Sequence, residues 1–304
     1  MIVQSPSPIT FSTEAGRRRV SRSYWTESAA RLARNPVGLA CGVLLVAFGL
    51  VGVFAPQLTS LLTHQDPAHQ NLHGVFAPSS AAHWFGTDEL GRDVLTRLIF
   101  GTRVTLGVAF LTITMSISVG TTVGMSAGYY GGVVDEILMR LVDMLLAIPP
   151  IFLFILLSIL LQPGPVTLAG IIAFVGWGGV SRLVRAETLS IKNRDFIMAA
   201  RSIGISDVRL LAMHILPNVL PIMIVAASLS MGQIILAEAA LDFLGLGIHP
   251  PTPSWGNMLT QADNYFFNAP RLVLFPGATI FLSVLATNLF GNALRDAFDP
   301  RVRH

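Results

Sequence analysis

The side chains best able to do chemistry on their own are four histidines that share a polar stretch with an aspartate. His64, His69, His73 and His83 lie near Asp66. Imidazole is a common ligand for nickel and zinc. The spacing matches no compact ligand motif, so a polar loop that carries a few histidines is the favoured interpretation. We therefore predict no metal site.

Two carboxylates, Glu238 and Asp242, lie one helical turn apart near the end of a long apolar run. Acidic groups inside a membrane are expected in a carrier coupled to protons or ions. Because both groups lie near the end of the run, we favour a structural or gating role. An ion- or proton-coupled secondary transporter is the alternative function.

The chain offers no set of residues typical of an enzyme. A phosphate-binding loop ends in Gly-Lys followed by Ser or Thr, but the single lysine, Lys192, follows Ile191. Cys41 is the only cysteine, which excludes an intrachain disulfide and a cysteine-based zinc site. We expect a protein that is not an enzyme, carries no cofactor of its own and binds no nucleic acid.

The elements that carry these residues are apolar runs long enough to cross a membrane. Of the 304 residues, 52% are hydrophobic and 12% are charged, and the mean hydropathy is +0.64. A spanning helix needs about 20 apolar residues, and in lipid the backbone must satisfy its own hydrogen bonds. We predict an all-α integral membrane protein with six transmembrane helices, near 37–54, 104–127, 139–161, 166–180, 219–241 and 272–289.

The arginines orient these spans. Most of them lie in 1–36, 182–218 and 292–304, whereas few lie in 57–103. Basic residues concentrate on the cytoplasmic side of a membrane protein. Both termini are therefore expected in the cytoplasm, with 57–103 outside.

The predicted organisation has five parts. The basic tail 1–36 is expected to be solvated, with an interfacial helix from Tyr24 to Arg34 as the alternative. After the first transmembrane helix (37–56) comes the outer loop 57–103, whose surface helix starts at Gly91 and turns into the second span at Gly101. The remaining parts are a core at 104–291, which holds the other five spans and an inner loop at 182–218, and a cytoplasmic tail at 292–304.

Small residues recur every four positions in the second span, which predicts close contact with another helix and hence a multi-helix bundle. They are Ser116, Gly120, Gly124 and Gly128. Pro149-Pro150 in the third span and Gly-Trp-Gly-Gly at 176–179 in the fourth predict kinks.

A stripe of small and polar residues follows one face of the fifth span. It consists of Ala226, Ser230, Gln233 and Ala237. We predict that Ser230 and Gln233, with Glu238, lie along a path for solute. Packing against the second span is the alternative.

The inner loop predicts a helix, a stop and a second helix. Asp195 suits a first turn, and Gly204 suits a left-handed helix end. Ser206 can cap the next helix, which Pro217 interrupts. An apolar stripe at helical spacing on the first helix is typical of a helix that docks into a partner's groove, with packing on its own bundle as the alternative. The stripe consists of Phe196, Ala199, Ala200 and Ile203.

This segment resembles the signature of permease subunits of ABC importers, which is Ala-Ala-x-x-x-Gly followed eleven residues later by Ile-Leu-Pro. Met198 stands where the family usually has Glu. The resemblance implies that Phe196 through Gly204 form the coupling helix that sits in a cleft of a cytoplasmic ATPase. The implied coupling residues are Arg194, Asp195, Phe196, Ala199, Ala200, Ile203, Gly204, Ile215 and Pro217.

Further stretches resemble the peptide and nickel branch of this family, in the subunit with the longer first outer loop. They run over 85–93, 127–132, 243–256 and 294–300. Asp242 stands where a small polar residue is usual, and Asn292 where an acidic one is usual. The resemblance implies a bundle like that of type I importer permeases.

The same resemblance implies a multi-pass permease of the inner (plasma) membrane that forms half of a translocation path for peptides or similar small polar solutes. Its implied partners are a second related permease, two cytoplasmic subunits that bind ATP and Mg, an extracytoplasmic solute-binding protein and the lipid bilayer. A permease for nickel chelates in the same family is an alternative. Dipeptide, oligopeptide, glutathione and nickel chelate all remain candidate solutes.

Overall fold

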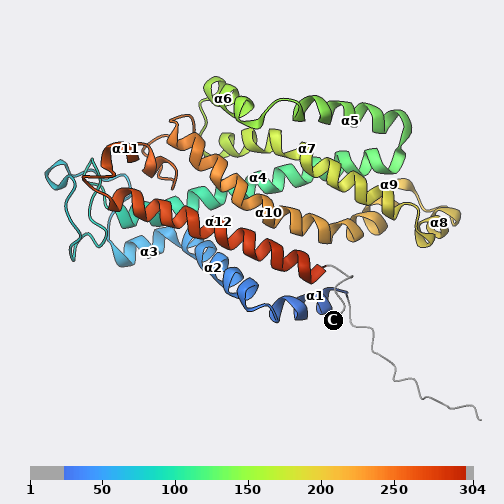
Figure 1. Cartoon of the computed structure of the whole chain (residues 1–304), viewed down its shortest axis with the longest axis horizontal. Coiled ribbons are helices and arrows are strands. Elements are labelled where there is room, and N and C mark those ends of the chain that lie inside the picture. Colours follow the sequence, from blue (N-terminus) through green and yellow to red (C-terminus); the bar gives the residue numbers. More distant parts are fainter. Residues whose placement is uncertain (1–23, 299–304) are drawn as a thin grey trace, which may run out of the picture.

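The protein is a bundle of long helices whose axes run roughly along the long dimension of the molecule (Figure 1). The computed structural model describes residues 24–298, which contain helices, turns and loops but no β-strand. Five helical segments are long and apolar enough to cross a membrane, or six if one bent helix pair counts as a single span. The all-α membrane fold is thereby confirmed.

The membrane-crossing candidates are α2 (Pro36–Val53), α4 (Val94–Tyr130), the bent pair α5 (Gly132–Leu146) and α6 (Pro150–Leu161), α7 (Pro165–Ile191), α10 (Leu216–Phe243) and α12 (Arg271–Phe298). The shorter elements are α1 (Tyr24–Ala33), α3 (Ala55–Leu62), η1 (Leu72–Gly74), α8 (Asp195–Ser202), α9 (Asp207–Leu210), the π-helical turn η2 (Leu211–Ile215), η3 (Asn257–Leu259) and α11 (Ala262–Tyr265).

Several helices begin at residues that suit a helix start. The Asn35 side chain accepts the Gly38 N–H at 2.9 Å at the start of α2. At the start of α4, Asp93 accepts the Thr96 N–H at 2.8 Å. Such caps satisfy backbone donors that have no partner inside the helix. Proline begins both α6 and α7, where its missing N–H costs nothing.

The small-residue stripe of α4 packs against α7, as the spacing predicts. The Ser116 hydroxyl donates to the Ala173 carbonyl at 3.4 Å. A Cβ added at Gly120 would lie 2.6 Å from the Val180 Cβ, and one at Gly128 would lie 2.9 Å from the Arg185 carbonyl oxygen. The two backbones approach this closely because glycine carries no side chain. This pair therefore forms the centre of the bundle.

The third span is broken rather than straight. α5 and α6 meet at an angle of 82°, and Pro149 and Pro150 lie at the junction, which confirms the predicted kink. α7 continues through 176–179 without a break. There Gly176 lies against Ser116, so this glycine serves close packing with α4.

The predicted surface helix that starts at Gly91 and turns at Gly101 is wrong. α4 begins at Val94 and passes Gly101 without interruption. A Cβ added at Gly101 would lie 3.0 Å from the Trp255 ring, so this glycine makes room for a neighbour. Val94 and Ile99 are buried in the protein and do not rest on a membrane surface.

The inner loop is shorter than the predicted range 182–218, because α7 runs on to Ile191. Arg182 and Arg185 therefore lie on a helix. The Arg185 guanidinium binds both carboxylate oxygens of Asp135 on α5, and Arg182 donates to Asp143 on the same helix. These two contacts fasten both ends of α5 to α7.

The two ends of the bundle differ in structure. α8, α9, α1 and the end of α12 lie at one end, whereas the long loop after α3 and α11 lie at the other (Figure 1). α1 is a helix that contacts α12 and α2, so 24–33 do not form the solvated tail that we favoured. The rest of the predicted basic tail before Tyr24, and the chain after Phe298, lie outside the described residues.

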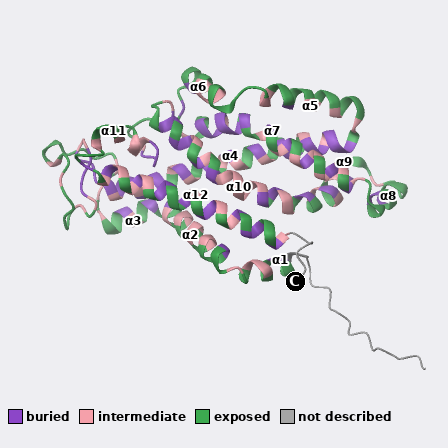
Figure 2. Cartoon of the chain, viewed as in Figure 1, coloured by how far each residue is buried: buried purple, intermediate pink, exposed green. Residues whose placement is uncertain are grey.

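The helices differ in how many of their residues are buried (Figure 2). α4 and α7 bury a larger share of their residues than α2, α5 and α6, which expose many apolar side chains. In a membrane such surfaces face lipid or another membrane protein.

Candidate functional site

The segment between α7 and α10 has the predicted order of helix, stop and second helix. Asp195 lies in the first turn of α8. The chain leaves this helix at Gly204, whose φ of +80° is left-handed. α9 and η2 then lead into α10, whose second residue is Pro217. Pro217 lies just after the π-helical turn in a helical stretch that runs from Asp207 to Phe243, so the regular α-helical pattern is broken next to this proline.

The faces of α8 differ sharply in exposure. Ile197 and Ala200 are buried, with 1% and 7% of their surface exposed, in an apolar cluster beneath the helix. Phe196, Ala199 and Ile203 are exposed, Ile203 by 79%. The predicted docking stripe is therefore divided, because Ala200 packs on its own bundle.

The other implied coupling residues fall into the same two groups. Arg194 and Asp195 are exposed at the start of α8. Ile215 is fully buried in the cluster that holds Ile197. Met198 is 52% exposed, so it extends the exposed apolar surface of α8.

A second feature is a cavity of about 520 Å³ between α4, α6, α7 and α10. The predicted stripe on α10 lines it, and Thr112 and Ser116 of α4 are also in its wall. None of the lining residues is charged. Its polar groups are hydroxyls and one side-chain amide, from Thr112, Ser116, Ser230 and Gln233.

Glu238, which we predicted to lie along the path, does not line this cavity. The side chain is fully buried, and its Oε1 accepts the Thr105 hydroxyl of α4 at 3.0 Å. The Thr105 oxygen in turn accepts the Trp255 N–H at 3.2 Å. Glu238 therefore joins α10 to α4 and to the loop that follows α10.

Asp242 organises that loop. Its carboxylate accepts the Ile248 N–H at 2.5 Å and the Ser254 hydroxyl. Trp255 is fully buried beneath the loop, and its indole N–H donates to the Leu98 carbonyl at 3.3 Å. We call residues 245–261, folded back in this way over the bundle, the outer cap. The carboxylate that departs from the family pattern thus has a structural role.

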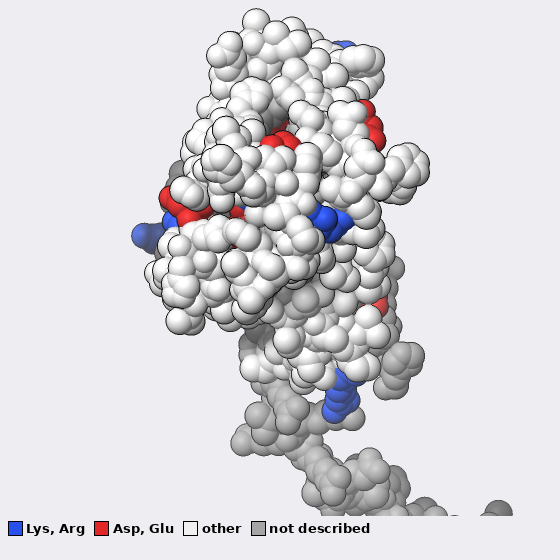
Figure 3. Space-filling view, turned by 90° about the vertical axis from the view of Figure 1, so that its left-hand side faces the viewer, with Lys and Arg blue, Asp and Glu red and all other residues white. Residues whose placement is uncertain are grey.

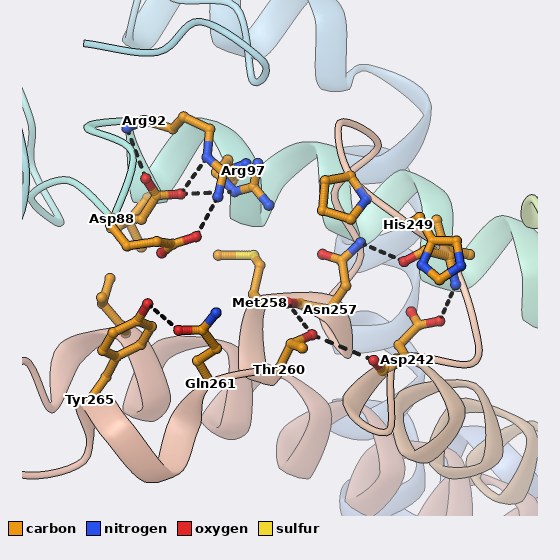
Figure 4. A pocket seen from close by; sticks show the side chains of 16 residues that line it. Asp88, Arg92, Arg97, Asp242, His249, Asn257, Met258, Thr260, Gln261 and Tyr265 are labelled. Carbon is orange, nitrogen blue, oxygen red and sulfur yellow. Dashed lines mark hydrogen bonds and ion pairs between the residues drawn. The ribbon is translucent and has the colours of Figure 1, made fainter. Parts of the chain in front are cut away.

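The outer cap and the loop before α4 enclose a polar pocket of about 150 Å³ (Figure 4). The Arg92 guanidinium donates to Asp88 at 2.7 Å and to Glu89 at 2.6 Å, and Arg97 lies 3.4 Å from Asp88. Acidic atoms are visible in a hollow on this face of the molecule (Figure 3). Burial, with a smaller effect of Glu89 and Asp88, raises the pKa of Tyr265.

The long outer loop is held against the start of α12. Arg271 donates to the carbonyl oxygens of Phe76 and Ala77 at 2.8 and 3.0 Å. The rings of Phe85 and Phe275 stack with their centroids 4.0 Å apart. The loop thus has structure of its own, as its length predicts.

The histidines of this loop do not gather. Within the described residues, no three His, Cys, Asp or Glu side chains are grouped so that they could hold a metal ion. His83 instead lies 3.0 Å from the Asp93 carboxylate that caps α4.

Sequence reasoning missed the contacts between the outer cap and α4. Thr105 and Trp255 lie 150 positions apart, and neither stands in a local pattern that predicts their contact. The motif Pro-Ser-Trp-Gly was visible as a family resemblance, but its partners on α4 were not.

Comparison with known proteins identifies the family. The family described as binding-protein-dependent transport system inner membrane component matches residues 120–304. The N-terminal transmembrane domain of oligopeptide transport permease C matches 23–78.

Curated relatives cover nearly the whole chain. The dipeptide transport system permease protein DppC of Alkalihalophilus pseudofirmus is 41% identical over 92% of this chain and 91% of its own length. The glutathione transport system permease protein GsiD of Pectobacterium atrosepticum is 37% identical over 94% of each chain. DppC of Haemophilus influenzae is 39% identical over 98% of this chain and 99% of its own.

The fold also has a solved counterpart. A structure of the MetNI methionine ABC transporter in an inward-facing conformation matches with a TM-score of 0.51 and 18% identity, over 65% of this chain and 96% of that chain. The likeness at this identity concerns the fold alone. Together with the family match and the curated relatives, it leads to one conclusion: the chain belongs to the binding-protein-dependent transport system inner membrane components and is a permease subunit of an ABC importer.

Proposed function

We propose that this permease forms half of the translocation path for peptides or similar small polar solutes, and that α8 is the helix on which the ATPase acts. Relatives named for dipeptide, oligopeptide and glutathione transport support this solute class. The role of α8 rests on one observation. This short helix exposes an apolar face, and its opposite face is anchored in the bundle.

In this proposal a second, related permease completes the path, and an extracytoplasmic binding protein delivers the solute. Two cytoplasmic subunits bind ATP and Mg. The end of the bundle with α8 faces the cytoplasm of a cell whose inner (plasma) membrane holds the chain. The arginines at this end support that orientation, among them Arg34, Arg194, Arg201 and Arg209.

The test replaces the exposed face of α8. In the double variant Phe196→Asp, Ile203→Asp, two carboxylates would be buried in the apolar groove of the ATPase. Side chains central to an interface typically contribute about 2 kcal/mol or more. We therefore expect the ATPase to bind about 30-fold more weakly and solute uptake into proteoliposomes to fall accordingly.

The matched control is Phe196→Leu, Ile203→Leu, which keeps the face apolar. This variant should bind the ATPase and transport solute nearly as the wild type does. Normal uptake by the aspartate variant would overturn the role of α8.

The cavity between α4, α6, α7 and α10 is the proposed part of the path within this chain. Ser230→Leu, Gln233→Leu should fill it and remove two of its polar groups. Uptake should fall at least about ten-fold, which corresponds to 1.4 kcal/mol, while co-purification with the other subunits remains unchanged. Unchanged uptake would show that the solute does not pass here. Ala227→Ser, in the same wall, is the mild control.

The family match does not favour a proton- or ion-coupled carrier. Glu238 and Asp242 are engaged in hydrogen bonds that hold α4 and the outer cap on α10. We assign them this structural role.

A further inference from the structure

We propose that Tyr129, at the inner end of α4, is the residue through which movement of α8 and α9 reaches α4. This proposal rests on the proposed function of α8. It goes further because it names the contact inside this chain that carries the movement onward. Tyr129 is a positioning residue and touches neither solute nor nucleotide in this role.

Tyr129 contacts the chain on both sides of the turn at Gly204. Its hydroxyl donates to Asp207, the first residue of α9, at 2.5 Å. The guanidinium of Arg201, in the last turn of α8, lies over its ring at 5.1 Å from the centroid. A single side chain of α4 thus holds α8 through a cation–π contact and α9 through a charge-assisted hydrogen bond.

The packing around Tyr129 makes this contact stiff. The residue is buried and shares one apolar cluster with Ile197 of α8, Leu210 of α9 and Val184 of α7. Packed interiors are dense and transmit displacement. A push on the exposed face of α8 therefore reaches α4, whose glycine stripe is in direct contact with α7.

Other polar contacts in this region connect different elements. Lys192 donates to the Gly128 carbonyl at 2.8 Å, and this contact joins the end of α7 to α4. Within 24–298, Tyr129 takes part in both the side-chain hydrogen bond and the cation–π contact that join α8 and α9 to α4. The polar part of the connection thus depends on one residue.

The experiment uses the complete transporter, with its second permease, ATPase subunits and binding protein, in proteoliposomes. The measured quantity is the number of ATP molecules hydrolysed per solute molecule taken up. Tyr129→Leu removes the hydroxyl and the ring, whereas Tyr129→Phe removes only the hydroxyl. Energetic coupling between sites typically corresponds to a factor of about 5 to 150. We expect Tyr129→Leu to raise the ratio about five-fold or more and Tyr129→Phe to raise it less.

Tyr130→Phe is the matched control, because Tyr130 is the next residue and is 52% exposed. It should keep the wild-type ratio. Asp207→Ala should raise the ratio about as much as Tyr129→Phe, and the double variant should be no worse than either one. Such non-additivity reports the contact itself. If Tyr129→Leu does not assemble, Tyr129→Phe and Asp207→Ala carry the test.

The proposal is contradicted if the Tyr129 and Asp207 variants assemble and hydrolyse the same number of ATP molecules per solute molecule as Tyr130→Phe. It is also overturned if the effects of Tyr129→Phe and Asp207→Ala simply add. These outcomes differ from failure of the proposed function, in which the aspartate variant of α8 would itself transport normally. If the aspartate variant of α8 loses coupling while the Tyr129 variants behave as the wild type does, the role of Tyr129 is rejected and the role of α8 stands.

Discussion

Gly124→Val is expected to separate α4 from α7 and to prevent the chain from forming a stable bundle. A Cβ at this position would strike the Ser181 carbonyl oxygen and would lie 2.9 Å from the Val184 Cβ. Backbone atoms of a packed helix cannot move aside as a flexible side chain can. Overpacking typically costs about 1–3 kcal/mol and sometimes more, and we expect the upper end here.

The measurement is the thermal unfolding midpoint of the detergent-solubilised protein, together with the monodisperse fraction in size-exclusion chromatography. Gly107→Val is the matched control, because Gly107 lies on the same helix and an added Cβ there meets no atom within 4 Å. We expect the control to resemble the wild type. Equal midpoints for the two variants would contradict the close α4–α7 contact.

Asp242→Leu is expected to release the outer cap from α10. The substitution leaves the Ile248 N–H and the Ser254 hydroxyl without the acceptor that they now share. Each buried polar group left without a partner costs about 1–3 kcal/mol. The loss should be local, because the cap is one loop while α4 and α7 keep their own contact.

Hydrogen exchange of peptides that cover the cap measures this effect. Protection at Ile248 should fall in Asp242→Leu and should be largely retained in Asp242→Asn, which keeps an oxygen acceptor. Peptides from the centre of α4 serve as the internal reference. If both variants exchange as the wild type does, Asp242 does not hold the cap.

The features that could be predicted from the sequence are those with a local cause. The four-residue repeat from Ser116 to Gly128 reports helical geometry, so its contact with another helix was predictable. The break at Pro149-Pro150 and the left-handed end of α8 at Gly204 follow from the backbone chemistry of proline and glycine.

Features that depend on distant parts of the chain were not predictable. A glycine that ends a helix and a glycine that admits a neighbour look alike in the sequence, and Gly101 belongs to the second kind because of Trp255. The face of α8 that lies inward is decided by the cluster around Tyr129 and Leu210. Periodicity alone grouped Ala200 with the docking surface for this reason.

The two-sided construction of α8 has a consequence for engineering. Because Ile197 and Ala200 secure the helix from within, the side chains that point away can be exchanged without disturbing the support beneath them. In the role that we propose for α8, a graft confined to Phe196, Met198, Ala199 and Ile203 would change the surface offered to the ATPase and leave the buried support of the helix intact.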